Sequence, residues 1–276
     1  LKRHWRVTDD PHALHRIDGA ELAYRSRELV TQLVIGPLYA RFPKEVVDAL
    51  EPEIQKAVYG ENKGTAKKTR QTLLFGAPEI AWLSKEAARL AAEADGDPKA
   101  ATKAVDNWRK DFRANIKTLR ENTALPAGLT AALFGRMVTS DTEANITAPV
   151  HVAHAFTVHA EEAESDYFTA MDDLSGDEPG ADTIQDTELT SGLFYGYVVV
   201  DLPGLVANLG GDADLAGRVL YNLIHLIAEV APQAKLGSTA PYGRAAFMLL
   251  EAGDRQPRSL AEAYRTPVKP ETAPAV

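Results

Sequence analysis

The sequence predicts an α+β protein, and three observations predict it. Apolar residues recur at helical spacing through much of residues 9–125, strand-like runs begin after residue 135, and a strong amphipathic helix over 212–230 separates two of those runs. The composition agrees, because 45% of the 276 residues are hydrophobic and 25% are charged. These values are ordinary for a globular protein with a sizeable core.

The N-terminal half is predicted to be helical. Two segments, 79–94 and 99–119, place apolar residues at the three- and four-residue intervals of one helix face. Between them, Asp97 is placed to cap the second helix, with Pro98 at its first position. The inward set of the second segment is Val105, Trp108, Phe112, Ile116 and Leu119.

The C-terminal half is predicted to form a small sheet. Residues 150–158 alternate, residues 193–200 are rich in aromatic and β-branched types, and 245–251 is a third candidate strand. The helix over 212–230, with Asp212 as its cap, lies between the last two. Strand, helix, strand is the half-unit of a ferredoxin-like or RNA-recognition-like sheet.

A long hairpin is predicted between the first two strand-like runs. Residues 172–188 hold seven acidic residues and no basic one, with Gly and Pro among them. Such a composition is typical of a solvated loop that joins two strands.

The charge of the chain restricts its partners. The net charge of −9 argues against a general nucleic-acid binder, because phosphate contacts need clustered Lys and Arg. However, Lys2, Arg3 and Arg6 make a local basic strip. The chain has no cysteine, which excludes disulfides and thiolate chemistry, and no apolar run approaches the length of a membrane span.

Catalytic motifs are scarce, so we expect no catalytic residues, no metal and no cofactor. His151, His154 and His159 lie close together in the sequence, but on a strand His154 points opposite to the other two. That geometry favours histidines bonded to their strand neighbours. A metal-dependent hydrolase that uses this region is the alternative function.

The segment FGRMVTSD, residues 134–141, fits neither a strand nor a core helix. It places Met137, one of only three methionines, in a polar turn. Met137 either fills a gap at the edge of the core or is presented to something outside the chain.

The run from 134 to 211 resembles the CasC family, the backbone subunit of type I-E CRISPR Cascade interference complexes. LKR (1–3) is also similar to the end of that family's Ser-Leu-Lys-Arg segment, although the family's first strand and the basic segment before it are absent from this sequence. The motifs that carry the resemblance, in order, are GRMVTS (135–140), HVAHAFTVHA (151–160), DYFTAMDDL (166–174), TSGLFYGYVVVDL (190–202) and NLGG (208–211).

The resemblance implies a fold that is likened to a hand. The palm, residues 1–8, 136–160 and 192–276, is an RNA-recognition-like (ferredoxin-like) sheet. The fingers, residues 9–135, are a helical insertion, and the thumb, residues 161–191, is a β-hairpin. Copies would stack into a helical filament along a guide RNA, and each thumb would interrupt the base stack of the RNA bound by a neighbour.

The resemblance also implies an RNA-binding site. Met137 and Phe168, with Tyr167 beside the latter, would flank the guide at the displaced base. From the residues alone, Phe168 as part of the hairpin core remains the alternative. The other residues implied to contact RNA are Lys2, Arg3, Arg6, Arg136, Thr139 and Ser140.

The partners implied by the resemblance are a guide CRISPR RNA, target DNA through that guide, further copies of the chain and the other Cascade subunits. A helicase-nuclease would be an indirect partner. No membrane partner is expected, and the expected location is the prokaryotic cytoplasm.

Overall fold

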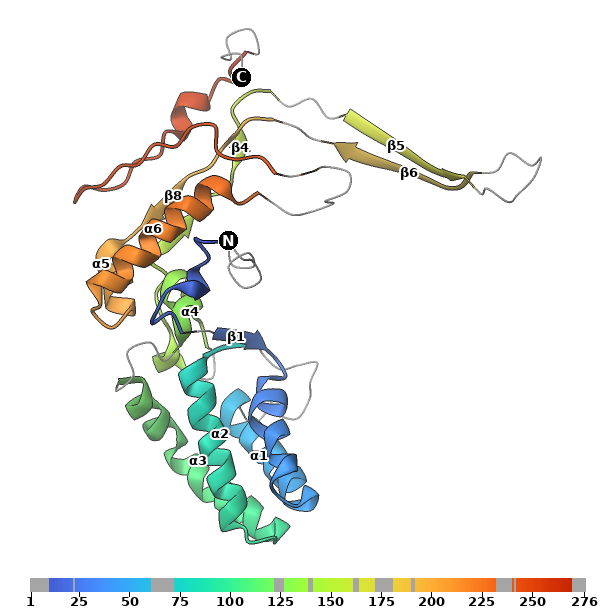
Figure 1. The fold of residues 1–276 in the computed structure, drawn as a ribbon, viewed down its shortest axis with the longest axis vertical. Coiled ribbons are helices and arrows are strands. Elements are labelled where there is room, and N and C mark those ends of the chain that lie inside the picture. The colour runs from blue at the N-terminus through green and yellow to red at the C-terminus, as the bar shows by residue number, and fades with distance from the viewer. Residues whose placement is uncertain are drawn as a thin grey trace. The chain divides into compact units, whose positions relative to one another are not determined.

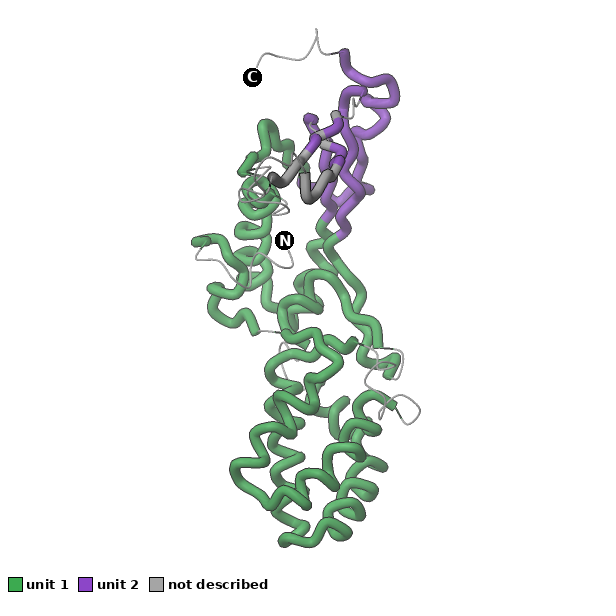
Figure 2. Tube along the Cα trace, turned by 90° about the vertical axis from the view of Figure 1, so that its right-hand side faces the viewer, with its two compact units in different colours: residues 1–150, 200–251 green, residues 151–199, 252–276 purple. Residues whose placement is uncertain are grey.

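The structure is a computed structural model, and the chain forms two compact units (Figure 2). Unit 1 comprises residues 1–150 and 200–251, and unit 2 comprises residues 151–199 and 252–276. The residues that the structure describes are 10–21, 23–60, 72–121, 127–138, 141–160, 164–171, 181–189, 192–231, 240 and 242–269. The division into palm, fingers and thumb remains a prediction.

Helices make up most of unit 1 (Figure 1). None of those described is long and apolar enough to cross a membrane. The α-helices of unit 1 are α1 (Lys44–Tyr59), α2 (Ala77–Glu93), α3 (Pro98–Glu121), α4 (Gly128–Phe134), α5 (Leu202–Asn208) and α6 (Ala213–Glu229). The short helical turns are η2 (Leu14–Arg16), η3 (Val30–Ile35), η4 (Gly36–Ala40) and η5 (Thr142–Ala144) in unit 1 and η6 (Ala261–Tyr264) in unit 2.

Helices α1, α2 and α3 pack together around one apolar core. Leu50, Leu83 and Ile116 are fully buried there, and each such side chain stabilises the fold by roughly 1.5–3 kcal/mol. The predicted face of α3 is confirmed, with Trp108 and Phe112 in ring contact at 4.9 Å between centroids. The predicted cap is also confirmed, because the Asp97 carboxylate accepts the backbone N–H of Lys99 at 2.9 Å.

A small sheet lies within the region 9–125 that was predicted to be mainly helical, so the prediction is wrong for its two strands. Strand β1 (Ala23–Ser26) pairs antiparallel with β2 (Leu73–Gly76), and Ala23 lies opposite Gly76. All residues of β2 are buried. The pairing joins segments far apart in the sequence, and β1 is too short to show alternation by itself.

The other strands also form separate two-stranded sheets. A continuous ferredoxin-like sheet is therefore not present among the described residues, and the RNA-recognition-like palm remains part of a proposal. The pairs are β3 (Val150–Val152) with β8 (Val198–Val200), β4 (Phe156–Thr157) with β7 (Phe194–Tyr195), and β5 (Glu164–Met171) with β6 (Ala181–Leu189).

The candidate strand 245–251 was predicted wrongly, because the structure has no strand there. Phe247 is 82% exposed, and Leu249 and Leu250 are exposed as well. The alternation over 150–158 is likewise not expressed as one buried face, since Val152 is exposed. In both segments these apolar side chains are exposed, because no other described element packs over them.

Helix α6 agrees with its sequence pattern. The Asp212 carboxylate accepts the N–H of Leu215 at 2.8 Å and caps the helix as predicted. Leu215, Val219 and Leu223 are buried. In the preceding helix α5, the Asn208 amide donates to the carbonyl oxygens of Ala132 (3.0 Å) and Thr147 (2.9 Å). This amide therefore fixes α5 to the chain on both sides of the loop that follows α4.

Tyr39 gives a test of the packing of η4 against α1. Its hydroxyl donates to Asp48 at 2.7 Å, and this hydrogen bond, followed by burial and the charges of Asp48 and Glu51, raises the pKa of Tyr39 to about 12. The folded pKa lies above the unfolded value of about 10, so the contribution to stability is complete below pH 10 and is lost as the pH rises through the folded pKa.

We expect a pH titration of tyrosinate absorbance to include a late step to which Tyr39 contributes. Asp48→Ala should return that tyrosine to the ordinary range, because it removes the acceptor. Glu45→Ala, on the same helix, is the control and should leave the late step in place. A late step that Asp48→Ala leaves unchanged would contradict the assignment.

Candidate nucleic-acid interface

The candidate interface is built on the loop after α4, which begins at Gly135. Gly135 has a φ of +72°, and a Cβ there would lie 2.8 Å from the carbonyl oxygen of Ile146. Glycine is therefore required, both for the backbone conformation and for the close approach. Arg136 and Ile146 then exchange two backbone hydrogen bonds, of 3.0 and 2.9 Å.

The two neighbours of Met137 point inward. Arg136 is 6% exposed and Val138 is 5% exposed, whereas Met137 between them is 73% exposed. The backbone N–H of Val138 donates to the Asn145 side chain at 2.6 Å, which fixes this alternation. The interpretation of Met137 as a filler at the edge of the core is therefore wrong, and the loop presents this side chain to the outside.

A buried charge network lies beneath the loop. The Glu79 side chain is fully buried, and its Oε1 accepts from Arg120 at 2.7 Å while its Oε2 accepts from Arg136 at 2.7 Å. Arg120 also donates to the Asp141 carboxylate at 2.7 Å. Since Arg136 and Asp141 stand at the two ends of the Met137 segment, both ends are tied to Glu79.

Backbone groups complete the network. The Gly76 N–H donates to Glu79 Oε2 at 3.2 Å, so this carboxylate also caps the N-terminus of α2. The Arg136 Nε donates to the Ala144 carbonyl oxygen at 2.8 Å. Each buried charge thus has an opposite charge and hydrogen-bond partners, which a buried ion requires.

The two arginines respond differently to burial. Burial by itself lowers the pKa of Arg120, but Glu79 and Asp141 outweigh it, and the pKa is raised above its usual range. The pKa of Arg136 is lowered, because burial is the largest effect, repulsion from Arg120 adds to it, and Glu79 offsets it in part. Arginine keeps its charge in both environments.

Arg136 therefore lies under the candidate interface and does not line it. Its guanidinium is engaged with Glu79 and the carbonyl oxygen of Ala144. In this arrangement it supports Met137 from the protein side. The sequence motif alone did not distinguish such a role from a direct RNA contact.

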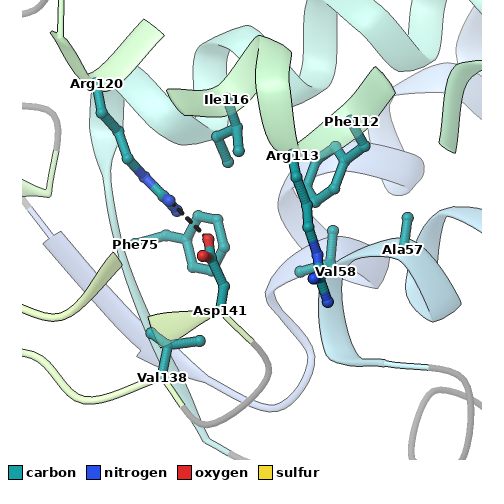
Figure 3. Close-up of a pocket in the computed structure, with 9 residues that line it drawn as sticks. All are labelled: Ala57, Val58, Phe75, Phe112, Arg113, Ile116, Arg120, Val138 and Asp141. Carbon is teal, nitrogen blue, oxygen red and sulfur yellow. Dashed lines mark hydrogen bonds and ion pairs between the residues drawn. The ribbon is translucent and has the colours of Figure 1, made fainter. Parts of the chain in front are cut away.

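A small pocket lies beside the network (Figure 3). Arg113, Arg120 and Asp141 line its polar part, and Phe75 and Ile116 belong to its apolar part. Its volume of about 20 Å³ is room for roughly one water molecule. It is too small for an organic substrate.

The aromatic part of the predicted site lies in the β5–β6 hairpin of unit 2. Tyr167 and Phe168 belong to β5, opposite Asp186 and Gln185 of β6. The Tyr167 side chain is 64% exposed and is thus available for contact. Met137 and Arg136 belong to unit 1, so the predicted residues come from both units.

Several predicted contacts fall outside the described residues. They are Lys2, Arg3, Arg6, Thr139 and Ser140.

The histidine region has a different arrangement from a metal site. Both ring nitrogens of His159 are engaged, Nδ1 with the Ala160 carbonyl oxygen at 2.7 Å and Nε2 with the Leu193 N–H at 3.1 Å. His151 and His154 are exposed. In the described part of the chain, no group of three or more His, Cys, Asp or Glu residues could hold a metal ion.

Sequence reasoning missed Glu79, Arg120 and Asp141. One signal was available for Glu79, which follows Gly76 by three residues at the start of a helix, the spacing of a capping box. Nothing in the sequence indicated that the same carboxylate also binds two distant arginines.

We expect Glu79→Gln to destabilise the chain by roughly 3–5 kcal/mol, because it leaves the buried guanidinium of Arg136 without its counter-charge and Arg120 with Asp141 alone. Glu93→Gln is the matched control on the same helix, since Glu93 pairs with Arg89 at the surface and such pairs contribute about 0–1 kcal/mol. Urea unfolding measures both free energies. Equal losses in the two variants would contradict the network's importance.

Comparison with solved structures shows a known fold. A chain of a solved structure described as a CRISPR RNA-guided surveillance complex, pre-nicking, superposes with a TM-score of 0.66 and 23% identity, over 91% of this chain and 68% of that chain. A chain of a second CRISPR RNA-guided surveillance complex aligns with 28% identity over 59% of this chain and 60% of that one, at a TM-score of 0.44 that is too low to establish a shared fold.

The sequence comparisons give one further result. No curated protein matches the chain. The sequence model of the CT1975-like protein family matches residues 1–275. The chain therefore belongs to the family of CT1975-like proteins.

Proposed function

We propose that this chain is a guide-RNA-binding backbone subunit of a CRISPR surveillance complex, of the CasC kind found in type I-E Cascade. It holds the RNA by its backbone, displaces bases at regular intervals and leaves the remaining bases free to pair with target DNA. Sequence reading is then delegated to base pairing, as in other RNA-guided systems. It acts as a non-catalytic subunit.

The observation that carries the proposal is Met137. It is 73% exposed on a loop that is held at one end by a buried ion pair and at the other by a partly buried one, in a chain whose fold is that of a surveillance-complex chain. Exposing a large apolar side chain on a rigid support has no benefit for folding. It does suit a contact with a ligand that has apolar faces, such as a nucleic-acid base.

The chemistry of the contact fits a site that must accept every guide. The thioether of Met137 presses against a ring without a hydrogen bond. Aromatic stacking, from Tyr167 and Phe168 in the hairpin, is worth roughly 1–3 kcal/mol per base whichever base is present. The phosphates are left to Lys2, Arg3, Arg6, Thr139 and Ser140, with Arg136 as a support.

The proposal assigns a part to each segment of the chain. Residues 9–135 are the fingers, 161–191 the thumb, and 1–8, 136–160 and 192–276 the RNA-recognition-like palm. Copies of the chain form a filament along the guide RNA. The other Cascade subunits are its protein partners, and the helicase-nuclease is an indirect one.

The first test places a fluorescent purine analogue at successive positions of the guide in assembled complexes. Wild-type complexes should brighten at regularly recurring positions, because an unstacked purine loses quenching. Met137→Ala/Phe168→Ala should flatten that pattern, since the displaced base loses its contacts. A uniform wild-type profile would count against the proposal.

The matched control is Met248→Ala. It removes a methionine that lies outside the candidate interface and should leave the pattern unchanged. If Met248→Ala flattened the pattern as much as the double variant does, the effect would be one of general stability.

A second test concerns the guide sequence. Phosphate contacts carry no sequence information, so assembly on guides with scrambled spacers of fixed length should differ by less than about three-fold in apparent affinity. RNA bound in purified complexes should accordingly be uniform in length and diverse in sequence. Strong preference for one spacer would contradict backbone binding.

A further inference from the structure

A three-way junction in unit 2 lies at the base of the β5–β6 hairpin. The sheet β4–β7 pairs Phe156 with Tyr195, and the ladder continues with the Val158 N–H donating to the Leu193 carbonyl oxygen at 3.0 Å. The Val158 carbonyl oxygen accepts from the N–H of Val268 at 2.8 Å. Three segments of the chain therefore meet at Val158.

His159 substitutes for a missing ladder bond at this junction. In a regular antiparallel pair the Leu193 N–H would donate to the Val158 carbonyl oxygen, which here accepts from the Val268 N–H. The Leu193 N–H donates to His159 Nε2 instead, at 3.1 Å. The imidazole thus supplies the acceptor for Leu193 at the strand end where Val158 accepts from Val268.

The hydrogen bonds also fix the role of each ring nitrogen. A carbonyl oxygen can only accept, so Nδ1 donates to Ala160 over 2.7 Å. A backbone N–H can only donate, so Nε2 accepts from Leu193. Both nitrogens of His159 are thus committed to the junction.

Gly192 lies so close to the same ring that a side chain there would collide with it. A Cβ at residue 192 would lie 2.9 Å from His159 Nε2 and 3.2 Å from Thr157 Cγ2. Any other residue would push the imidazole off the Leu193 amide. Gly196, four residues on, has nothing within 4 Å of such a Cβ, so the requirement is local to residue 192.

His159 and Leu193 lie at the end of the β4–β7 sheet from which the chain runs to the hairpin. Val158 bonds to Leu193, and within the described residues the next pair is Glu164 with Leu189. The bond between His159 and Leu193 therefore joins the two strands at the base of the hairpin.

We propose that His159 is a positioning residue that clasps the two legs and sets the direction in which the hairpin leaves the β4–β7 sheet. Its consequence for RNA rests on the proposed function, because the hairpin carries Tyr167 and Phe168. The clasp itself is a property of the chain without RNA. The two ideas can therefore fail separately.

The variants separate the acceptor from the size of the side chain. His159→Gln keeps an acceptor that can reach the Leu193 amide, whereas His159→Leu fills similar space without one. Gly192→Ala keeps the histidine in the sequence but displaces its ring. Gly196→Ala is the matched glycine control. All are tested in the full chain without RNA.

The first measurement is hydrogen exchange at the Leu193 amide. Exchange should become about ten-fold faster in His159→Leu and Gly192→Ala, and should stay within about three-fold of wild type in His159→Gln and Gly196→Ala. The Leu215 amide, bonded to Asp212 in unit 1, reports general unfolding and should not change.

The second measurement is the direction of the hairpin. The chain has no cysteine, so Glu188→Cys on β6 and His154→Cys, both at exposed positions, can carry spin labels alone. The distance distribution between the labels should broaden in His159→Leu and Gly192→Ala and keep its wild-type width in His159→Gln.

Unchanged exchange at Leu193 and an unchanged distribution in His159→Leu and Gly192→Ala would overturn the clasp. If His159→Leu also speeds exchange at Leu215, that variant has a general effect on folding. The comparison of exchange at Leu193 between Gly192→Ala and Gly196→Ala then decides the question by the same criterion. A clasp that behaves as expected, with guide RNA absent from purified complexes, would leave the clasp standing and sink the proposed function.

Discussion

The contact of Glu79 with two arginines is the constraint on which the candidate interface depends. A carboxylate with no exposure to water is tolerable only when opposite charges and hydrogen-bond donors surround it. Glu79 meets this need with Arg120, Arg136 and the Gly76 N–H. The same bonds join the start of α2 and the end of α3 to the loop after α4, so the loop cannot shift without leaving a buried charge uncompensated.

Because of this constraint, neighbouring residues of one short segment have different roles: some hold the loop in place, and one is exposed for contact. Arg136 and Val138 are committed to the protein, and Met137 between them faces outward. A rigid support reduces the entropy that a flexible methionine segment would lose on binding. The exposed group itself is apolar and adaptable, which suits recognition of a ring without recognition of its identity.

The strand-rich parts depend on side chains more than on long ladders. The sheets of the described structure have two strands each, and several strands have only two or three residues. Such pairs are marginal by themselves. Asn208 in unit 1 joins α5 to α4 and to Thr147, and His159 in unit 2 supplies the acceptor for the Leu193 N–H at the end of the β4–β7 pair.

The sequence by itself determined the helices, since their hydrogen bonds are local and their buried faces repeat every three to four residues. The core of α3, the Asp97 cap and helix α6 followed from that pattern. Met137 also stood out from the sequence, as an apolar residue in a polar turn.

Only the tertiary structure decided which segments pair and which charges meet. Strand β1 pairs with β2, which lies far from it in the sequence. Residues 245–251 form no strand although their sequence is apolar. The inward position of Arg136 depends on Glu79, which comes from another helix. Strand pairing and buried ion pairs join residues distant in sequence, so no local spacing specifies them.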